Sequence, residues 1–460
     1  MGAAPGPRPR RFWLRTFGCQ MNVHDSEKVE SLLLHSGYTA ARSPDEADLL
    51  IVNTCSIREK AEHRLYSDLG LLRSWKEGGP GRVLGVGGCV AQQEGDALLL
   101  RFPQVDFVFG THNLRLVPAL ALAAGEGQRV ARTEERRSLD RFELPIAPPE
   151  LSRKNPGRAY LTVMEGCDMF CSFCIVPVTR GREISRPAEA ILREAESLAQ
   201  RGVRELILLG QTVNAYGRHA LRRGNAEATG TLAFAELIRR LAKLPGISRI
   251  RYTSPHPLFF DDDLVAAHGD LAPLCPHVHL PVQSGSDAVL RAMRRRYGRE
   301  QYLRLVTRLR GARPDLALTT DLIVGFPGET DRDFEDTLAL VREVGFVDSY
   351  SFKYSPRPGT AAASLEASQA VPEPVKQARL EALQSQQKSL TLAAHRARVG
   401  TRTEILLEGE SRRGGQLSGR DPYHRIVNLS ARAPGSFPPG SLVPVEVVEA
   451  TPHSLLAEPA

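Results

Sequence analysis

The sequence predicts an α/β protein in three parts: an N-terminal doubly wound parallel α/β domain at residues 10–126, a central partial (β/α)6 TIM-like barrel at 153–388, and a small C-terminal antiparallel β-barrel of OB-like type at 389–458. Three observations predict this order. Short apolar runs alternate with helical periods from residue 12 onward, six more strand–helix units follow residue 156, and the end of the chain holds β-branched runs separated by Gly and Pro. A length of 460 residues suits about three domains.

In the N-terminal domain, the alternation of strands and helices predicts a parallel sheet with helices between the strands. The expected strands are 13–17, 48–54, 82–88 and 106–110, and the expected helices are 25–35, 58–75, 92–101 and 114–124. A connector that contains Pro and Arg is expected at residues 125–156.

Six strands are expected in the central domain, and its functional residues should lie at their carboxyl ends. These strands are 158–164, 204–209, 248–252, 277–282, 317–324 and 348–354. The clearest helix is 187–201, because Pro187 fits a first helical position and Gly202 fits a C-terminal cap. A helix at 374–398 should lead to barrel strands at 403–407, 425–429, 442–447 and 454–456.

Composition excludes several classes of protein. The sequence has no run of about 18 apolar residues, so we expect no membrane span. Seven cysteines in a long chain indicate metal ligands in a reducing cytoplasm rather than a secreted disulfide framework. A formal charge of +7 permits a polyanionic partner. Five arginines between Arg291 and Arg299 fit either a solvated helix face or a contact with an RNA backbone.

Cys167, Cys171 and Cys174 are the residues that most clearly indicate chemistry. They are spaced Cys-x3-Cys-x2-Cys in a loop that follows a predicted strand. Three thiolates with no fourth Cys or His close behind can hold three irons of a [4Fe–4S] cubane and leave the fourth iron open. A closed zinc site would need four protein ligands, so a structural metal knuckle is the less favoured alternative.

A second trio comes from residues that are far apart in the sequence. Cys19, Cys55 and Cys89 each follow directly after a predicted strand. Parallel strands bring their carboxyl ends to one edge of a sheet, so these thiols should converge there. Each could be a buried thiol by itself, but three at one topological position predict a second three-thiolate cluster.

Polar residues in Gly-Pro settings also follow five strands of the predicted barrel, at 210–214, 253–257, 279–286, 324–329 and 354–360. Any one of these segments could be an ordinary turn, in which Gly, Pro and polar residues are common. Five of them on one rim of the barrel favour a ligand-binding site at that end. His256 and His279 are expected to form hydrogen bonds rather than bind metal. Cys275 is expected to be an inert buried thiol.

The first trio and the strand before it resemble the radical S-adenosylmethionine (SAM) superfamily, and nearly the whole chain resembles its methylthiotransferase family. That family has an N-terminal cluster domain, a radical SAM core and a C-terminal TRAM domain. Among its branches the chain most resembles tRNA-2-methylthio-N6-dimethylallyladenosine synthase, through GCQMN at 18–22 followed by DSE at 25–27, NTCSIREKA at 53–61 and TRGRE at 179–183. The usual Asn after Gly210-Gln211 is Thr212 here, a mild departure expected to leave the cysteines untouched.

The resemblance implies a tRNA-modifying enzyme that inserts a methylthio group at C2 of N6-isopentenyladenosine next to the anticodon, using two SAM and a reductant. The implied cofactors are SAM and two [4Fe–4S] clusters. Cys167, Cys171 and Cys174 would hold the cluster that cleaves SAM, and Cys19, Cys55 and Cys89 the second one. The residues implied to hold SAM are Gly210, Gln211, Gln283 and Gly325.

The resemblance also implies partners. They are a tRNA anticodon arm that carries isopentenyladenosine, held by TRAM and the Arg-rich segments, an electron donor such as flavodoxin or ferredoxin, and a sulfur source; we expect a monomer. The same reaction on threonylcarbamoyl-adenosine of tRNA, or on an aspartate of a ribosomal protein, is the nearest alternative. A non-catalytic iron–sulfur carrier or RNA-binding chaperone is an alternative of a different class.

Overall fold

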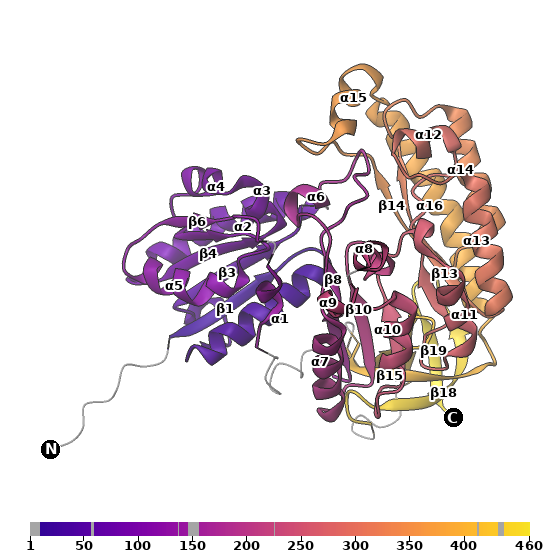
Figure 1. Cartoon of the computed structure of the whole chain (residues 1–460), viewed down its shortest axis with the longest axis horizontal. Coiled ribbons are helices and arrows are strands. Elements are labelled where there is room, and N and C mark those ends of the chain that lie inside the picture. The colour runs from indigo at the N-terminus through magenta and orange to yellow at the C-terminus, as the bar shows by residue number, and fades with distance from the viewer. Residues whose placement is uncertain are drawn as a thin grey trace. The chain divides into compact units, whose positions relative to one another are not determined.

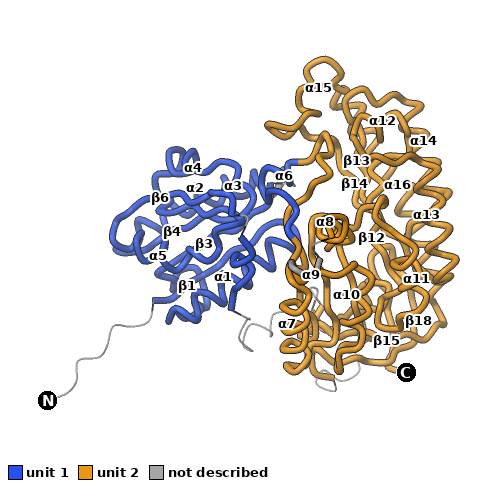
Figure 2. The backbone as a smooth tube through the Cα atoms, in the orientation of Figure 1, with its two compact units in different colours: residues 1–151, 175–184 blue, residues 152–174, 185–460 orange. Residues whose placement is uncertain are grey.

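The computed structural model describes residues 10–56, 59–136, 138–145, 156–224, 226–411, 414–430 and 437–460, with the backbone alone at 59–61, 226 and 228. Part of the expected connector, at 146–155, and Ile57 and Arg58 of the second motif lie outside the described residues. The chain forms two compact units (Figure 2): unit 1 takes in residues 1–151 and 175–184, and unit 2 takes in residues 152–174 and 185–460.

Unit 1 is built on a six-stranded sheet in the order β2-β1-β3-β4-β5-β6 (Figure 1). All of its strand pairs are parallel, which confirms the predicted doubly wound domain. Its strands are β1 Arg11–Thr16, β2 Thr39–Ala40, β3 Leu49–Thr54, β4 Val83–Gly88, β5 Phe107–Phe109 and β6 Val130–Arg132.

Helices cover both faces of this sheet, because successive side chains of a strand point to opposite faces. Leu49 and Ile51 of β3 pack in a core with α1 and α5, whereas Leu50 and Val52 pack in a core with α2, α3 and α4. The helices of unit 1 are α1 Gln20–His35, α2 Glu59–Glu77, α3 Cys89–Glu94, α4 Asp96–Arg101, α5 Val117–Gly125 and α6 Val176–Thr179, with 3-10 turns η1 Pro44–Glu46, η2 Leu114–Leu116 and η3 Leu139–Phe142.

Three expectations for unit 1 were wrong. The first helix begins at Gln20, five residues before the predicted start, so Cys19 is its N-cap. The helix expected at 92–101 is two helices, because the chain turns at Gly95 with a φ of 51°. Residues 130–132 of the expected connector form the edge strand β6, which at three residues is too short to be recognised by its periodicity.

Unit 2 contains the predicted partial barrel of six parallel strands (Figure 1). Two parallel three-stranded sheets, β11-β10-β7 and β12-β13-β14, are joined by a parallel bridge between Ile250 and Leu274. The strands are β7 Arg158–Thr162, β10 Glu205–Leu209, β11 Arg249–Tyr252, β12 His277–His279, β13 Ala317–Val324 and β14 Asp348–Lys353, with β8 Met164–Glu165 and β9 Ile184–Ser185 as short additions.

Helices surround these strands and share one large apolar core with them. Pro187 is the N-cap of α7 rather than its first helical residue, and Gly202 follows the helix with a φ of 88°. The helices are α7 Ala188–Gln200, α8 Arg218–Arg223, α9 Ala226–Thr229, α10 Phe234–Leu241, α11 Asp262–Asp270, α12 Asp287–Ala292, α13 Arg299–Ala312, α14 Asp331–Val344, α15 Ala361–Gln369 and α16 Glu373–Arg396, with 3-10 turns η5 Val213–Ala215 and η6 Pro257–Phe259.

The C-terminal strands form a closed barrel in the order β15-β16-β17-β19-β18. One neighbouring pair, β17 and β19, is parallel, which differs from the expected antiparallel barrel. A ring with an odd number of strands cannot alternate direction throughout, so at least one parallel pair is unavoidable. Polar β16 was not predicted. The strands are β15 Arg402–Glu410, β16 Leu417–Arg420, β17 Ile426–Leu429, β18 Leu442–Ala450 and β19 Leu455–Pro459.

Arginines at the amino ends of the central strands hold this C-terminal barrel. Arg249 donates to the carbonyl of Arg420 at 2.9 Å and to that of Glu404 at 2.7 Å. Arg251 donates to the carbonyl of Asp421 at 3.0 Å. The C-terminal barrel therefore packs at the amino ends of strands whose carboxyl ends carry the loop of Cys167.

Among the helices that the structure describes, none is both long enough and apolar enough to cross a membrane.

Acid is expected to destabilise unit 2 through His268. This side chain is fully buried in α11, and its Nε2 lies 2.6 Å from the hydroxyl of Tyr252. Burial, and then the charge of Arg313, lowers the pKa of His268 to about 3. Below its ordinary pKa of 6.5, the unfolded chain therefore binds a proton that the folded protein excludes until about pH 3.

The free energy of unfolding should consequently fall by up to about 1.4 kcal/mol per pH unit on account of His268 as the pH drops through this window. Chemical denaturation at a series of pH values measures the slope. A His268→Gln variant should be less stable at pH 8 but should lose stability less steeply below about pH 6.5. Equal slopes in the two proteins would contradict this assignment.

Candidate functional site

The structure brings Cys19, Cys55 and Cys89 together at the carboxyl ends of β1, β3 and β4. Cys19 caps α1, Cys55 follows β3 and Cys89 begins α3. The thiol of Cys55 is hydrogen-bonded to those of both Cys19 and Cys89. Since β1, β3 and β4 are neighbours in a parallel sheet, the three turns that follow them meet at one edge.

Two glycines allow this close approach. A Cβ at Gly18 would lie 2.3 Å from the Cβ of Cys55, and one at Gly88 would lie 2.3 Å from the carbonyl oxygen of Thr54. Their φ angles of 124° and 96° also favour glycine. Any larger residue at either position would push the strand tips, and so the thiols, apart.

Buried amides hold the turns that carry the thiols. The Nδ2 of Asn22 donates to the carbonyl of Thr54 at 3.2 Å, and the thiol of Cys19 lies 3.3 Å from the Oδ1 of Asn22. Asn53 donates to the carbonyl of Asn22 at 2.9 Å. These contacts give a structural role to Asn22 and Asn53, the asparagines of the first two motifs, for which the sequence alone indicated no role.

The site in unit 1 also has a buried positive charge. Arg180 is 3 % exposed, and its Nη2 lies 2.5 Å from the Oδ2 of Asp25. Hydrogen bonding to the thiol of Cys55, and then the charge of Arg180, lowers the pKa of Cys19 and of Cys89 to about 6. The same two hydrogen bonds, to Cys19 and to Cys89, raise the pKa of the Cys55 thiol well above its ordinary value. Soft sulfur donors in a cradle that glycine keeps open suit an iron–sulfur cluster.

Asp25→Asn is expected to lower the free energy of unfolding of unit 1 by about 3 kcal/mol, because it breaks the buried ion pair between Asp25 and Arg180. Chemical denaturation of the full chain, followed by Trp fluorescence, measures the change. Glu46→Gln is the matched control, since it removes the same charge from a half-exposed pair with Arg11 and should cost less than about 1 kcal/mol. A similar loss in both variants would contradict a special role for the buried pair.

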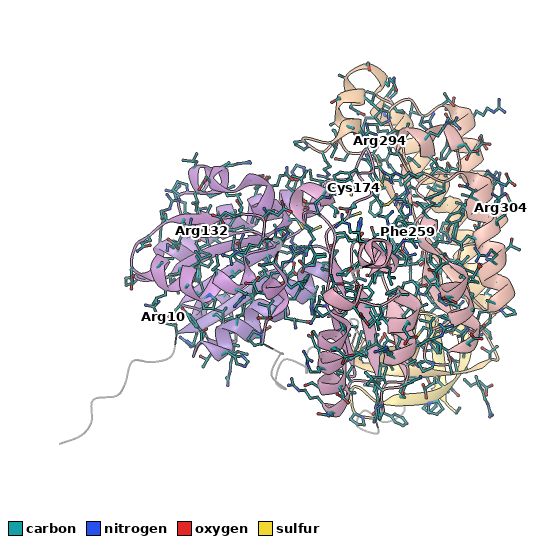
Figure 3. The ribbon with its side chains drawn as sticks, in the orientation of Figure 1. Arg10, Arg132, Cys174, Phe259, Arg294 and Arg304 are labelled. Atoms are coloured by element: carbon teal, nitrogen blue, oxygen red, sulfur yellow. The ribbon has the colours of Figure 1, made fainter. Side chains whose placement is uncertain are left out.

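Cys167, Cys171 and Cys174 lie in one loop of unit 2, after β7 and β8 (Figure 3 labels Cys174). The amide of Cys174 donates to the carbonyl of Cys171 at 3.1 Å, so the last two cysteines share a tight turn. Between them, Ser172 ties the loop to the end of α12, through its amide to the carbonyl of Met293 at 3.1 Å and its hydroxyl to that of Ala292 at 2.7 Å. All seven cysteines of the chain are described, and none is in a disulfide.

Gln211 and Thr212 lie against this loop. The Oε1 of Gln211 accepts from the amide of Gly166 at 2.5 Å, while its buried Nε2 has no hydrogen-bond partner in the part of the chain that the structure describes. The hydroxyl of Thr212 is 3.0 Å from the sulfur of Cys167, so the expectation that Thr212 would leave the cysteines untouched was wrong. An unsatisfied buried amide beside the loop fits a polar ligand at this position.

The other residues expected to bind SAM line the same end of the barrel. A Cβ at Gly210 would lie 2.6 Å from the Cγ of Met164, directly before the loop. Gln283 forms a parallel bridge with Leu322 in the left-handed conformation, at a φ of 76°. Gly325 has a φ of 70° and its amide donates to Glu329 at 2.6 Å. The four residues therefore follow β10, β12 and β13, the strands that the sequence indicated.

Three further residues behave as expected. The Nδ1 of His256 accepts from the amide of Leu258 at 3.2 Å, and burial lowers the pKa of His256 well below its ordinary value. The Nδ1 of His279 hydrogen-bonds to the hydroxyl of Thr319 at 3.0 Å. Cys275 is 3 % exposed, and burial raises the pKa of its thiol. Their geometry is that of hydrogen-bonded and packed side chains.

Sequence reasoning missed Asp25, Arg180 and Arg295. The first two were noticed only as parts of motifs, and the third as one of a run of arginines. Arg295 is 6 % exposed, and its Nη1 lies 3.5 Å from the sulfur of Cys171. The spacing of this run did not indicate which arginine points inward, because residues 294–296 lie in a turn without helical or strand periodicity.

Three family models match successive parts of the chain. A model described as an uncharacterized protein family, UPF0004, matches residues 11–110, the radical SAM superfamily matches residues 161–341, and the TRAM domain matches residues 396–460. The first contains Cys19, Cys55 and Cys89, and the second contains Cys167, Cys171 and Cys174.

Solved structures share the fold at low sequence identity. The radical S-adenosylmethionine methyltransferase TsrM from Kitasatospora setae, solved with cobalamin and a [4Fe-4S] cluster bound, is 15 % identical with a TM-score of 0.56, over 77 % of this chain and 74 % of that one. The cobalamin-dependent S-adenosylmethionine radical enzyme OxsB, solved with aqua-cobalamin, is 12 % identical with a TM-score of 0.50, over 78 % of this chain and 55 % of that one.

The order of the three matched domains is itself specific. A UPF0004 domain with one cysteine trio precedes a radical SAM barrel with another, and a TRAM barrel closes the chain. Together these three domains are the signature architecture of the radical SAM methylthiotransferases.

Proposed function

We propose that this enzyme inserts a methylthio group at C2 of N6-isopentenyladenosine next to the anticodon of tRNA, using two molecules of SAM and a reductant. The aromatic C2–H of adenine is too weakly acidic for an ordinary base and hydride is no leaving group, so the substitution requires abstraction of a hydrogen atom. The observation that supports the proposal most is that one chain has two separate cysteine trios. Neighbouring side chains hold the cysteines of each trio in place.

In unit 2, Cys167, Cys171 and Cys174 would hold a [4Fe–4S] cluster, a cofactor that the TsrM structure also contains. When bound, this cluster supplies the electron that cleaves SAM to a 5′-deoxyadenosyl radical. The chain's own residues orient the ligands: Gln211 holds the amide of Gly166, and Thr212 lies on the sulfur of Cys167. The unsatisfied Nε2 of Gln211 is a donor suited to a carboxylate such as that of SAM.

In unit 1, Cys19, Cys55 and Cys89 would hold the second cluster, which supplies the sulfur that is methylated and transferred. Arg180 places a buried positive charge beside these thiols and so favours the thiolate forms of Cys19 and Cys89. Gly18 and Gly88 leave room beside the thiols, and neither has a side chain that could act as a fourth ligand.

A cleft on the carboxyl rim of the barrel supports an RNA substrate. It has a volume of about 170 Å³ and is lined by polar and aromatic residues together with apolar ones, all from the segments that follow β10 and β11. They are Asn214, Tyr216, Arg218, Leu221, Arg222, Ala233, Phe234, Phe259, Asp261 and Leu264. The guanidinium of Arg218 lies 4.7 Å from the centre of the Phe259 ring. An aromatic face beside two arginines suits a nucleotide, whose base stacks while its phosphate pairs with a cation.

Mass analysis of tRNA nucleosides from cells with and without this protein tests the substrate. The proposal expects 2-methylthio-isopentenyladenosine to be replaced by isopentenyladenosine when the protein is removed. Intact 2-methylthio-isopentenyladenosine would overturn it, and loss of the methylthio form of threonylcarbamoyl-adenosine, or of a methylthio-aspartate in a ribosomal protein, would assign one of the alternative substrates. Absence of 5′-deoxyadenosine from the iron-replete protein with SAM and reductant would favour a non-catalytic carrier.

Replacing Arg218 and Arg222 together by Gln is expected to weaken binding of an anticodon stem-loop and to lower the slope of log affinity against log salt by about 0.7 per lost phosphate contact. Fluorescence anisotropy over a series of salt concentrations measures both. Phe259→Ala should weaken binding without changing the slope, because it removes stacking and no charge. Arg304→Gln, on the exposed face of α13, is the matched control and should change neither; an equal effect of the control would contradict the assignment of the cleft.

A further inference from the structure

Arg295 is a buried cation beside one of the cysteines of unit 2. Its Nη1 lies 3.5 Å from the sulfur of Cys171, its Nη2 donates to the carbonyl of Pro281 at 3.0 Å, and its Nε donates to the hydroxyl of Tyr297 at 3.0 Å. Among the residues that the structure describes, no carboxylate pairs with it. A guanidinium is always charged and is costly to bury without an anion. The sulfur of Cys171 is the group in contact with Arg295 that can carry the compensating negative charge.

The backbone on both sides of Arg295 is held in an unfavourable conformation. Arg294 and Arg296 have φ angles of 58° and 60°, in the left-handed region that residues with a Cβ rarely adopt. Conformations of this kind are strained and persist where the surrounding fold imposes them. Arg291, Arg294 and Arg296 are exposed, so the turn directs one arginine of the run inward and the others outward (Figure 3 labels Arg294).

The same turn is attached to the cysteine loop at a second point. Ser172, the residue after Cys171, hydrogen-bonds to the carbonyls of Ala292 and Met293, at the end of α12. Tyr297 donates to the carbonyl of Val282 at 3.0 Å and so fixes the other side of the turn to the barrel. The distance between the guanidinium of Arg295 and Cys171 is therefore set by rigid attachments and not by a mobile surface chain.

We propose that Arg295 is a positioning residue for the cluster of unit 2: its guanidinium hydrogen-bonds to the sulfur of Cys171 and raises the reduction potential of the cluster that this cysteine holds. Adding an electron to a cluster increases its negative charge, and a nearby buried cation stabilises that reduced form. Hydrogen bonds to ligand sulfurs are among the factors that tune such potentials. The proposal rests on the part of the proposed function that places a cluster on Cys167, Cys171 and Cys174, and it is independent of the RNA substrate and of methylthio transfer.

A redox titration of the full-length protein followed by electron paramagnetic resonance tests the proposal without SAM or RNA. Cys19, Cys55 and Cys89 are replaced by Ala in every sample, so that the signal comes from one cluster. Arg295→Met is compared with Arg294→Met, which removes the same charge from the exposed neighbouring residue of the same strained turn. Arg295→Gln is a second neutral variant whose amide can still donate to the carbonyl of Pro281.

The expected result is that Arg295→Met weakens electron uptake by at least tenfold, a shift of about 59 mV to more negative potential for a one-electron couple. Arg295→Gln should shift the potential in the same direction, whereas Arg294→Met should leave it near that of the parent. Arg295→Lys, which keeps the charge but not the planar fork, should lie between parent and Arg295→Met.

Equal potentials in all variants, or equal shifts for Arg294→Met and Arg295→Met, would overturn the proposal. Loss of the fold or of the iron from both neutral variants would also overturn it, because Arg295 would then be a structural clamp for the loop. If no sample, including the parent background, held iron, the proposed function itself would fail at Cys167, Cys171 and Cys174. That outcome is distinguishable from a failure confined to Arg295.

Discussion

Cys171→Ala is expected to abolish reductive cleavage of SAM, whereas Cys19→Ala should leave it close to that of the parent protein. Cys171 belongs to the trio whose loop contacts Gln211 and Thr212. The buried Nε2 of Gln211 has no hydrogen-bond partner among the described residues. Cys19 belongs to a separate trio in unit 1. The two substitutions therefore act on separate trios, one in each unit.

Formation of 5′-deoxyadenosine from SAM and dithionite measures this difference, and iron analysis measures how much iron each variant retains. The parent should hold about eight irons per chain after anaerobic reconstitution, and each variant about four if its damaged site releases its cluster. Cys275→Ala is the matched control, since it removes a buried thiol that belongs to neither trio and should change neither quantity. SAM cleavage by Cys171→Ala at the parental rate would contradict the assignment.

Glu205→Gln is expected to lower the free energy of unfolding of unit 2 by about 5 kcal/mol, at the top of the range for breaking a buried ion pair. Its carboxylate is fully buried and lies 2.9 Å from the Nε of Arg158, 3.4 Å from the Nε of Arg251 and 3.8 Å from an Nη of Arg249. Burial opposes ionisation of Glu205, but the charges of Arg251, Arg158 and Arg249 prevail and lower its pKa. Removing one negative charge leaves three guanidiniums close together.

The same substitution should loosen the TRAM barrel, because Arg249 and Arg251 also donate to TRAM carbonyls. Chemical denaturation gives the loss of stability, and limited proteolysis should show earlier cleavage after α16. Glu404→Gln is the matched control: it removes a half-exposed partner of Arg249 at 3.3 Å and should cost less than about 1 kcal/mol. An equal loss of stability in the two variants would show that the positions of Arg249 and Arg251 do not depend on Glu205.

Topology and pattern were sufficient to predict much of this protein. The convergence of Cys19, Cys55 and Cys89 followed from a general property of parallel sheets, since each residue comes directly after a strand. The six parallel strands of the barrel followed from repeated periodicity. Both arguments require only the positions and directions of the strands, and the pattern of apolar residues in each segment indicates these.

Side-chain direction in turns could not be predicted in the same way. Arg295 is buried among exposed arginines because Arg294 and Arg296 adopt left-handed backbone angles, and no pattern of apolar residues indicates such a turn. Arg180 and Asp25 lie 155 positions apart in the sequence, and only the folded unit 1 brings them together. Strand β6 was missed because it has only three residues, and β16 because it is short and polar.

The attachment of TRAM at the amino ends of the barrel strands limits the size of a ligand that contacts both TRAM and the loop of Cys167. Strand β10 has five residues, so its two ends are separated by roughly 17 Å. A free nucleoside is too small to reach from one end to the other. An RNA that bound TRAM and also placed a base at the loop of Cys167 would have to extend along the outside of the barrel. Shortening that RNA should weaken its binding before it changes which base reacts.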